Sequence, residues 1–195
     1  MRLQFLLYSL IGLLFFTACN SDYTPRPRGY FKVPLPKHEY RLFDKPGYPY
    51  TFEYPVYANV IQDSTFFEEK PENPYWINID FPQFSGCVYI SYKEIGKQSF
   101  EKLVDDTYKM TFKHTVKATG INDSLIETPH GVSGIFFKVG GNAASGRQFF
   151  LTDTVKHFLR GALYFGATPN EDSLKEVGDF LEQDIRHLIN TFKWR

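Results

Sequence analysis

The sequence predicts an α+β fold in which a mostly antiparallel sheet is sandwiched by two main helices. Several short runs alternate apolar and polar residues as strands do, and two longer segments carry apolar residues at spacings of three and four, as on the buried face of a helix. These elements come in the order strands, helix, strands, helix. Aromatic residues make up 18% of the chain, which favours sheets with large packed faces.

Length and charge limit the class of protein. A chain of 195 residues suits one domain with one good core. Its hydrophobic content of 43% is too high for a disordered chain. The 22 basic and 22 acidic residues cancel, so no basic excess indicates binding to nucleic acid or to an anionic membrane surface.

The N-terminus has the pattern of a lipoprotein signal. The apolar run over 3–16 is shorter than the roughly 20 residues that a membrane-spanning helix needs. It ends in a large apolar residue and two small ones before Cys19, which is the pattern of a bacterial lipobox. An ordinary signal peptide with a chance cysteine is the alternative. We predict a signal peptide over 1–18, with cleavage before Cys19 and acylation of its thiol.

The residues after Cys19 indicate the membrane to which the mature lipoprotein would be sorted. Acyl chains such as palmitate contribute about 0.8 kcal/mol for each buried CH₂ and would anchor the mature chain firmly. Asn20 rather than an aspartate follows the cysteine, and Asp22 is the one acidic residue nearby. Neither the simple inner-membrane retention signal nor an acidic surface-export signal is present. We therefore expect a lipid-anchored protein of the cell envelope, at the outer membrane and facing the periplasm.

Lipidation of Cys19 would leave Cys87 as the single free thiol. A disulfide within the mature chain is then impossible. Cys87 lies in an alternating apolar stretch, which indicates a buried structural cysteine rather than a reactive one.

An extended tether is predicted over 19–37, because this segment is rich in proline and lacks periodicity. It is either a passive spacer or a segment that docks a partner, since its aromatic residues are costly to expose along a mere linker. Arg26, Arg28 and Tyr30 are its candidate partner-binding residues.

A single globular α+β domain is predicted over 38–195. Its first strand covers 50–57 and is broken near Pro55, which places it at a sheet edge or bulge. The segment 60–74 is predicted as a loop. A β-hairpin follows, with strands over 75–81 and 87–92. Ser99 is a suitable N-cap for a helix over 100–114.

The second half is predicted as an antiparallel meander followed by a helix. Strand-like runs cover 116–121, 124–128, 134–139, 147–152 and 156–165, and residues suited to turns separate them. The final helix opens at 169–173, and its apolar residues step by three or four from Leu174 to Phe192. The order of elements is similar to that of Mog1/PsbP-type α/β/α sandwiches, without a shared motif.

Local motifs for chemistry are weak. The five histidines are too scattered for a metal site built on a local motif, and the Gly-x-Ser-x-Gly pattern of a nucleophile elbow does not occur. The glycine-rich segment 140–146 is either a hairpin loop or a cradle for an anion, but it lacks the lysine of a P-loop. Paired acids fit helix ends and solvated faces. We predict no catalytic residues, no metal and no cofactor.

Arg160 is the most unexpected charge, because it interrupts the apolar strand over 157–165. It either faces solvent by alternation or pairs in a cleft. With Gly161 beside it, the functional alternative is a contact point where another backbone or a ligand comes close. Arg160 is therefore the fourth candidate partner-binding residue.

Long collinear stretches resemble the gliding motility lipoprotein GldD family. They are Cys19 with 22–31, then 52–55, 76–79, 89–93, 113–115, 148–153, 157–165, 169–170 and 172–174. The resemblance covers nearly all of the mature chain. It implies a bacterial cell-envelope lipoprotein that is needed for gliding and linked to type IX protein secretion with other Gld proteins. It implies no catalytic mechanism, no cofactor and no residue with an established role.

Three hypotheses for function follow. The first is a non-enzymatic accessory component that binds other gliding or secretion lipoproteins and envelope components. The second is a ligand-binding lipoprotein whose aromatic side chains stack on a glycan or an apolar molecule, which would need an enclosed, aromatic-lined pocket. The third is an envelope hydrolase, which would need His, Ser and acidic residues clustered in one cleft.

Overall fold

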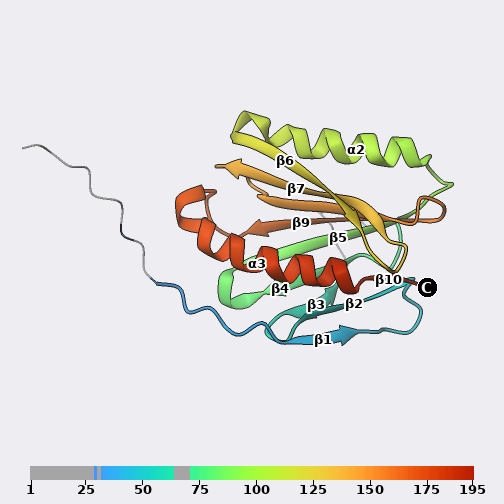
Figure 1. Ribbon diagram of the computed structural model, residues 1–195, viewed down its shortest axis with the longest axis horizontal. Helices are drawn as coiled ribbons and strands as arrows, with labels where there is room; N and C mark the ends of the chain where they lie inside the picture. The colour runs from blue at the N-terminus through green and yellow to red at the C-terminus, as the bar shows by residue number, and fades with distance from the viewer. Residues whose placement is uncertain (1–28, 30–31, 64–70) are drawn as a thin grey trace, which may run out of the picture. The chain divides into compact units, whose positions relative to one another are not determined.

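The strands form two sheets in the part of the chain that the structure describes. The structure is a computed structural model, which describes residues 29, 32–63 and 71–195, and residues 33–195 form one compact unit (Figure 1). The helices are α2 (Phe100–Phe112) and α3 (Glu171–Thr191), with 3₁₀ helices η1 (Pro82–Phe84) and η2 (Lys113–Val116). The strands are β1 (Tyr40–Phe43), β2 (Tyr50–Pro55), β3 (Asn59–Gln62), β4 (Ile77–Phe81), β5 (Gly86–Glu94), β6 (Ala118–Glu127), β7 (Ser133–Gly141), β8 (Arg147–Thr152), β9 (His157–Phe165) and β10 (Lys193–Trp194).

The larger sheet has seven strands in the order β3-β4-β5-β9-β8-β7-β6 within the described residues. All of its neighbours pair antiparallel. The smaller sheet has the order β1-β2-β10 and is also antiparallel. The mixed α+β class with an antiparallel sheet and two main helices is thus confirmed, as are the hairpin of β4 and β5 and the meander from β6 to β9.

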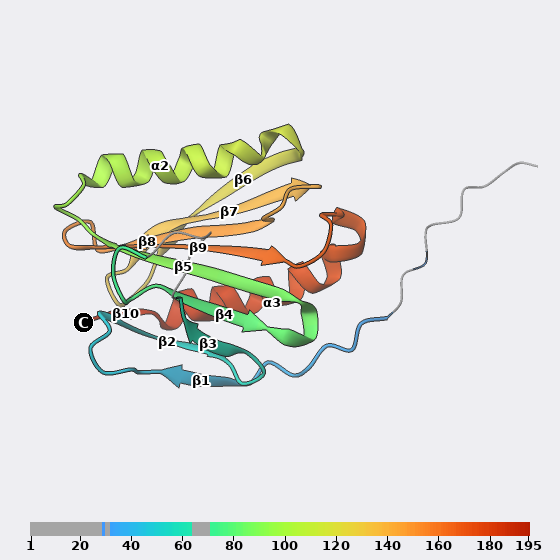
Figure 2. The ribbon, with the colours of Figure 1, turned by 180° about the vertical axis from the view of Figure 1, so that it is seen from behind.

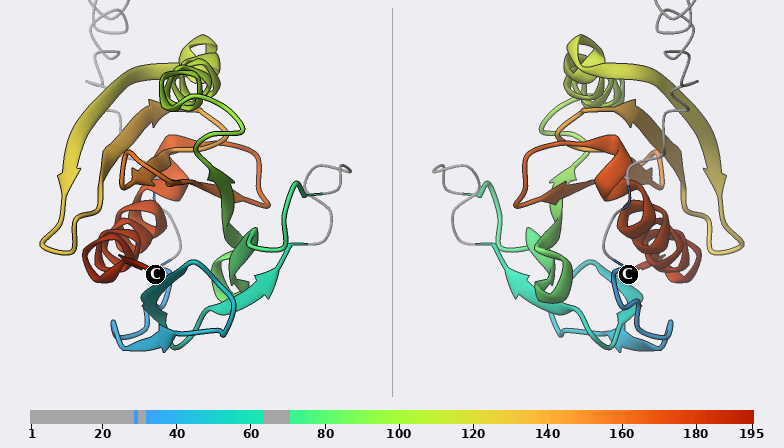
Figure 3. Two further views of the ribbon diagram at one scale, coloured as in Figure 1. Left: turned by 90° about the vertical axis from the view of Figure 1, so that its right-hand side faces the viewer. Right: turned by 90° about the vertical axis from the view of Figure 1, so that its left-hand side faces the viewer.

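The large sheet lies between two layers. Helix α2 covers one face, and α3 together with the small sheet covers the other (Figures 2 and 3). Each face has its own apolar core. On the α3 face, Tyr50 and Phe52 of β2 pack with α3 and with β4, β5 and β9. On the α2 face, Leu103 packs with Phe137, Phe150 and Phe158.

Both helices begin at residues that the sequence marks. The Ser99 hydroxyl accepts the backbone N–H of Lys102, and the Asn170 side chain accepts that of Ser173. Acidic residues in the first turn of each helix favour its N-terminal end. Helix α2 ends at Phe112 and continues as η2, so the predicted helix over 100–114 is about two residues too long.

Several strand predictions are wrong. The segment 60–74 contains most of β3, and β1 and β10 were not predicted, because these strands are short and lack alternation. The runs 116–121 and 124–128 are one continuous strand, β6, with an irregular register between Ala118 and Ile121. Its turn-like residues are tolerated because β6 is the outer edge of the sheet. Strand β2 lies in the middle of its sheet, and Pro55 is its last residue, beyond the reach of β10.

Gly161 lies where the ring of Phe149 closely approaches the backbone of β9. A Cβ atom at this position would lie 2.2 Å from the ring of Phe149, which is itself fully buried. The space beside Gly161 is therefore filled by a side chain of the neighbouring strand rather than by a ligand. The glycine is required by packing on the α3 face.

We expect Gly161→Ala to lower the free energy of unfolding by about 1–3 kcal/mol, because a buried ring would have to move. Urea unfolding of the full-length protein measures this change. Gly120→Ala, at an edge position with open space around it, should change stability by less than about 0.5 kcal/mol. Equal effects of the two substitutions would contradict the packing explanation.

Candidate functional site

A buried carboxylate in the middle of α3 collects three donors from the start of the domain. Asp184 is 1% exposed. Its Oδ1 lies 2.7 Å from Nδ1 of His38 and accepts the Tyr40 hydroxyl at 3.0 Å, while its Oδ2 accepts the Tyr57 hydroxyl. We call these four residues the entry clamp. A buried carboxylate is stabilised only when such donors surround it.

Aromatic rings hold the clamp in place. The ring of His38 stacks on Phe180 of α3, with centroids 4.3 Å apart, and the ring of Tyr40 stacks on His187 at 3.5 Å. Nε2 of His187 in turn lies 2.7 Å from Oε2 of Glu53 on β2. The beginning of the domain is thus fixed to α3 by polar and by stacking contacts.

The residues just before the clamp are also fastened. The carbonyl oxygen of Pro34 accepts Nε2 of Gln83 in η1 at 2.9 Å, and Val33 packs against the core of the α3 face. The chain therefore joins the domain along the α3 side, on the opposite face of the large sheet from α2 (Figure 1).

The entry clamp has the carboxylate–imidazole pair with which hydrolases orient a general base. In the described part of the chain, however, His38 has no polar partner besides Asp184. Burial, reinforced by Asp184, raises the pKa of Tyr57 and of Tyr40 well above the ordinary value. Both phenols therefore stay protonated at neutral pH and donate to the carboxylate. This arrangement fastens the first residues of the domain to α3.

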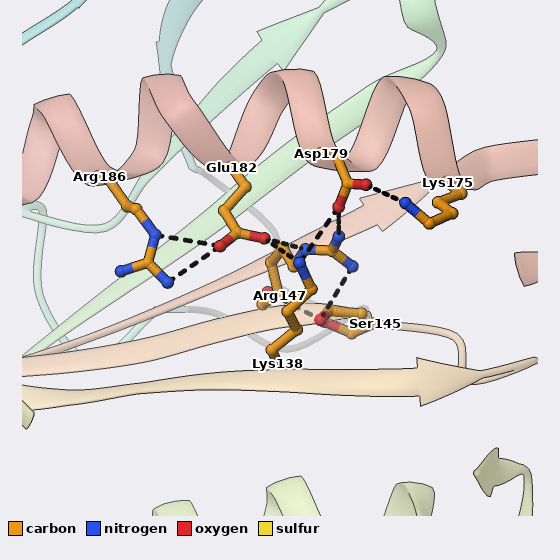
Figure 4. A network of polar contacts seen from close by, with 8 residues as sticks. Lys138, Ser145, Arg147, Lys175, Asp179, Glu182 and Arg186 are labelled. Carbon is orange, nitrogen blue, oxygen red and sulfur yellow. Dashed lines mark hydrogen bonds and ion pairs between the residues drawn. The ribbon is translucent and has the colours of Figure 1, made fainter. Parts of the chain in front are cut away.

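A second polar network fixes the outer face of α3 (Figure 4). Nε of Arg147 on β8 donates to Glu182 at 2.9 Å, and its Nη2 donates to Asp179 at 2.5 Å. Lys138 of β7 pairs with both acids. Partial burial acts to raise the pKa of Asp179, but hydrogen bonds from Lys175 and Lys138 outweigh it and hold that pKa at about 2.

The glycine-rich segment 140–146 lies beside this network. With the first turns of α3 it lines a cavity of about 110 Å³, whose other lining residues include Leu163, Phe165 and Leu174. The segment joins β7 to β8 as a hairpin connection. Among the described residues around the cavity, Phe165 is the one aromatic.

Four of the predicted site residues, Cys19, Arg26, Arg28 and Tyr30, lie outside the described residues. Arg160 lies on β9 on the face that α2 covers and is half-buried, and its Nη2 donates to Oε1 of Gln148 at 2.7 Å. The structure brings it together with none of the entry-clamp residues.

Cys87 is half-buried in β5. Burial, reinforced by the nearby Asp80, raises the pKa of its thiol to about 12. The thiol is protonated at neutral pH, which agrees with the structural role predicted for it.

An exposed surface combines apolar and basic side chains where α2 ends. Phe112 is 48% exposed and Val116 is 85% exposed. The ring of Tyr108 stacks on that of Phe112, with centroids 6.1 Å apart. Lys109, Lys113 and Lys117, spaced by four, are exposed in the same segment. We call Phe112, Val116 and these three lysines the α2 end patch.

No local sequence motif marks the entry clamp. One signal was available: Asp184 falls between Leu181 and Ile185, on the apolar face of the final helix, where an acid is out of place. Nothing local could link it to His38 and Tyr57, which lie more than a hundred residues away in the sequence.

Fold and site together define an α+β domain, fastened by its first residues to its last helix. The sequence matches the family model of the gliding motility lipoprotein GldD over residues 20–194, and the chain belongs to this family. It is accordingly a lipid-anchored lipoprotein of the cell envelope from a gliding motility family.

Other comparisons are more distant. No curated protein is significantly similar in sequence. The solution structure of cyanobacterial PsbP (CyanoP) from Synechocystis sp. PCC 6803 is similar, with a TM-score of 0.46 and 13% identity, over 86% of this chain and 98% of that one. Within the described residues, no helix combines the length and apolar character needed to cross a membrane.

We expect Asp184→Ala to lower the free energy of unfolding by about 3 kcal/mol, because three half-buried donors lose their buried acceptor. Trypsin should then cut after Lys37 at least tenfold faster, which corresponds to about 1.4 kcal/mol of easier local opening. Gln183→Ala, at the exposed neighbouring position, is the control. Unchanged cleavage after Lys37 would show that the clamp does not fasten this segment.

The ion pairs around Arg147 should make the free energy of unfolding depend on pH in the acidic range. The folded pKa of Asp179, about 2, is lower than its ordinary value of 3.8, so the unfolded chain takes up the proton first as the pH falls. We therefore expect stability to be lost between about pH 5 and pH 2. Asp179→Asn removes the titrating group and should flatten this part of the profile, measured by urea unfolding at each pH. A profile that Asp179→Asn leaves unchanged would contradict the assignment.

Proposed function

We propose that this lipoprotein is a non-enzymatic accessory component of the gliding machinery that acts by binding an envelope protein and is linked to type IX protein secretion. Acyl chains on Cys19 would hold it at the outer membrane, facing the periplasm. Its partners would be other gliding or secretion lipoproteins and envelope components, and not nucleic acid. Membership of the gliding motility lipoprotein family supports the biological role.

The observation that carries the binding proposal is the α2 end patch. Large apolar side chains such as Phe112 and Val116 are costly to leave in water when they stand together. Lys113 and Lys117 have no ion pair within the described chain. An apolar surface bordered by unpaired cations suits a protein partner with an apolar centre and acidic residues around it.

The position of the patch agrees with a tethered protein. The chain enters the domain on the α3 side, and α2 lies on the opposite face of the large sheet (Figure 3). The segment from Cys19 to Val33 reaches at most about 50 Å when fully extended. A domain held in this way can present the α2 end patch away from its point of attachment.

The aromatic residues support docking rather than capture of a glycan or an apolar molecule. Tyr50, Phe52 and Phe192 are fully buried, and their rings stack on one another in the core of the α3 face. Rings that fill a core are not available to a ligand. The ligand-binding hypothesis called for an aromatic-lined pocket, and the cavity beside segment 140–146 contains Phe165 alone among described aromatic residues.

Crosslinking and affinity purification of the native lipidated protein from gliding cells tests the proposal. We expect the double variant Phe112→Glu, Val116→Glu to reduce recovery of a specific gliding or secretion partner by about tenfold and to impair gliding, because charges replace the apolar centre. Val155→Glu, at a turn residue that is 76% exposed, is the matched control. A Cys19→Ser strain shows what loss of the anchor alone does.

A triple alanine variant at Arg26, Arg28 and Tyr30 separates the two candidate contact regions. If that variant loses the partner while the α2 end variant retains it, the interface lies on the tether and not on α2. If both variants and the Cys19→Ser strain glide and secrete normally, the proposal of a tethered partner-binding component fails.

A further inference from the structure

Arg160 carries a desolvated charge without a counter-ion. Its Nη2 donates to the neutral amide oxygen of Gln148, and its side chain is hydrogen-bonded to the hydroxyl of Tyr164. Its Nε atom is buried and has no acceptor. Within the described residues no carboxylate forms an ion pair with it. Burial lowers the pKa of Arg160, and Tyr164 counteracts this in part.

Arg147, on the adjacent strand, is a partly buried arginine that does have carboxylate partners, and it can be compared with Arg160. Its Nε and Nη2 bind the carboxylates of Glu182 and Asp179. A guanidinium does not lose its proton near neutral pH, so a buried one requires anionic acceptors or suffers a large desolvation cost. Arg160 has neutral acceptors but no anionic one, and an anion from outside the chain would supply it.

The space for such an anion adjoins Arg160. A cavity of about 50 Å³ lies between the sheet and α2, lined by Arg160, Ser91 and Thr107 together with Lys93, Leu103, Asp106, Met110 and Phe158. One water needs roughly 10–15 Å³, so this space accommodates a group of several atoms, such as a carboxylate or a phosphate.

The polar residues that line the cavity differ in whether they are already paired. Ser91 is paired directly across from Arg160 in the β5–β9 ladder, so both side chains project from the same face. Lys93 is paired with Glu72 at 2.8 Å, and Thr107 donates to the carbonyl oxygen of Leu103. Asp106 lines the cavity but forms no ion pair with Arg160. The groups left to bind an anion are the Arg160 guanidinium and the Ser91 hydroxyl.

We propose that the cavity beside Arg160 binds a small oxyanion, a carboxylate or a phosphate group, with Arg160 as its principal ligand and Ser91 as a second donor. Planar bidentate donation by a guanidinium suits both groups. This site lies under α2 and is independent of the proposed docking at the α2 end patch. It identifies Arg160 as a ligand-binding residue rather than an exposed contact.

Titration of the full-length protein in detergent with inorganic phosphate or with acetate, at constant ionic strength, tests the site. We expect saturable binding of one anion, with a rise in Tm of about 2–4 °C at saturation. Arg160→Met should weaken binding at least tenfold and leave the Tm without anion unchanged or higher, because an unpaired charge is removed. Arg147→Met is the matched control, which should lower the Tm yet bind the anion as the wild type does.

The two anions separate the two sources. A response to phosphate alone assigns a phosphate group, and a response to acetate alone assigns a carboxylate. Ser91→Ala should weaken anion binding about two- to fivefold. If Arg160→Met does not fold, Ser91→Ala tests the site in its place, and an unchanged affinity of that variant would contradict the proposal. Absence of a saturable response to either anion, or equal affinity in wild type and Arg160→Met, would overturn the proposal.

Discussion

Burial of both faces of the seven-stranded sheet is the constraint on which the rest of this structure depends. Strand β9 lies in the centre of that sheet, and its side chains alternate between the core under α2 and the core under α3. Gly161 makes room for the ring of Phe149 on one face, while Phe158 packs on the other. A charge on such a strand is partly taken out of water, which is why Arg160 differs from the exposed Arg186 of α3.

The same constraint explains how α3 is held. Its apolar face packs on the sheet, but the same face carries Asp184, which needs partners where the first residues of the domain cover it. Asp184 satisfies His38, Tyr40 and Tyr57 there, and Arg147 satisfies Asp179 on the outer side. Helix α3 thereby connects the beginning of the domain to the end of the chain.

The two helices have different roles in consequence. Helix α3 is surrounded by the sheet, the small sheet and the entry segment, so its surface is largely used within the domain. Helix α2 covers its face with a smaller core and leaves apolar and basic side chains exposed at its end. This asymmetry places the α2 end patch on one side of the large sheet and the entry of the chain into the domain on the other. An oxyanion bound beside Arg160 would lie between α2 and the sheet.

The sequence by itself determined the α+β class, the two helices with their N-caps, the hairpin, the meander and the family, because these depend on local periodicity and on collinear motifs. It indicated the lipobox cysteine and the unusual charge at Arg160. Only the tertiary structure decided that β1, β2 and β10 form a separate sheet, since short strands acquire their pairing from distant partners. It alone brought His38, Tyr40 and Tyr57 to Asp184, and it alone left Arg160 without a carboxylate. The contacts of Asp184 and of Arg160 both depend on which side chains meet across the fold. The spacing of residues along the chain does not predict such long-range contacts.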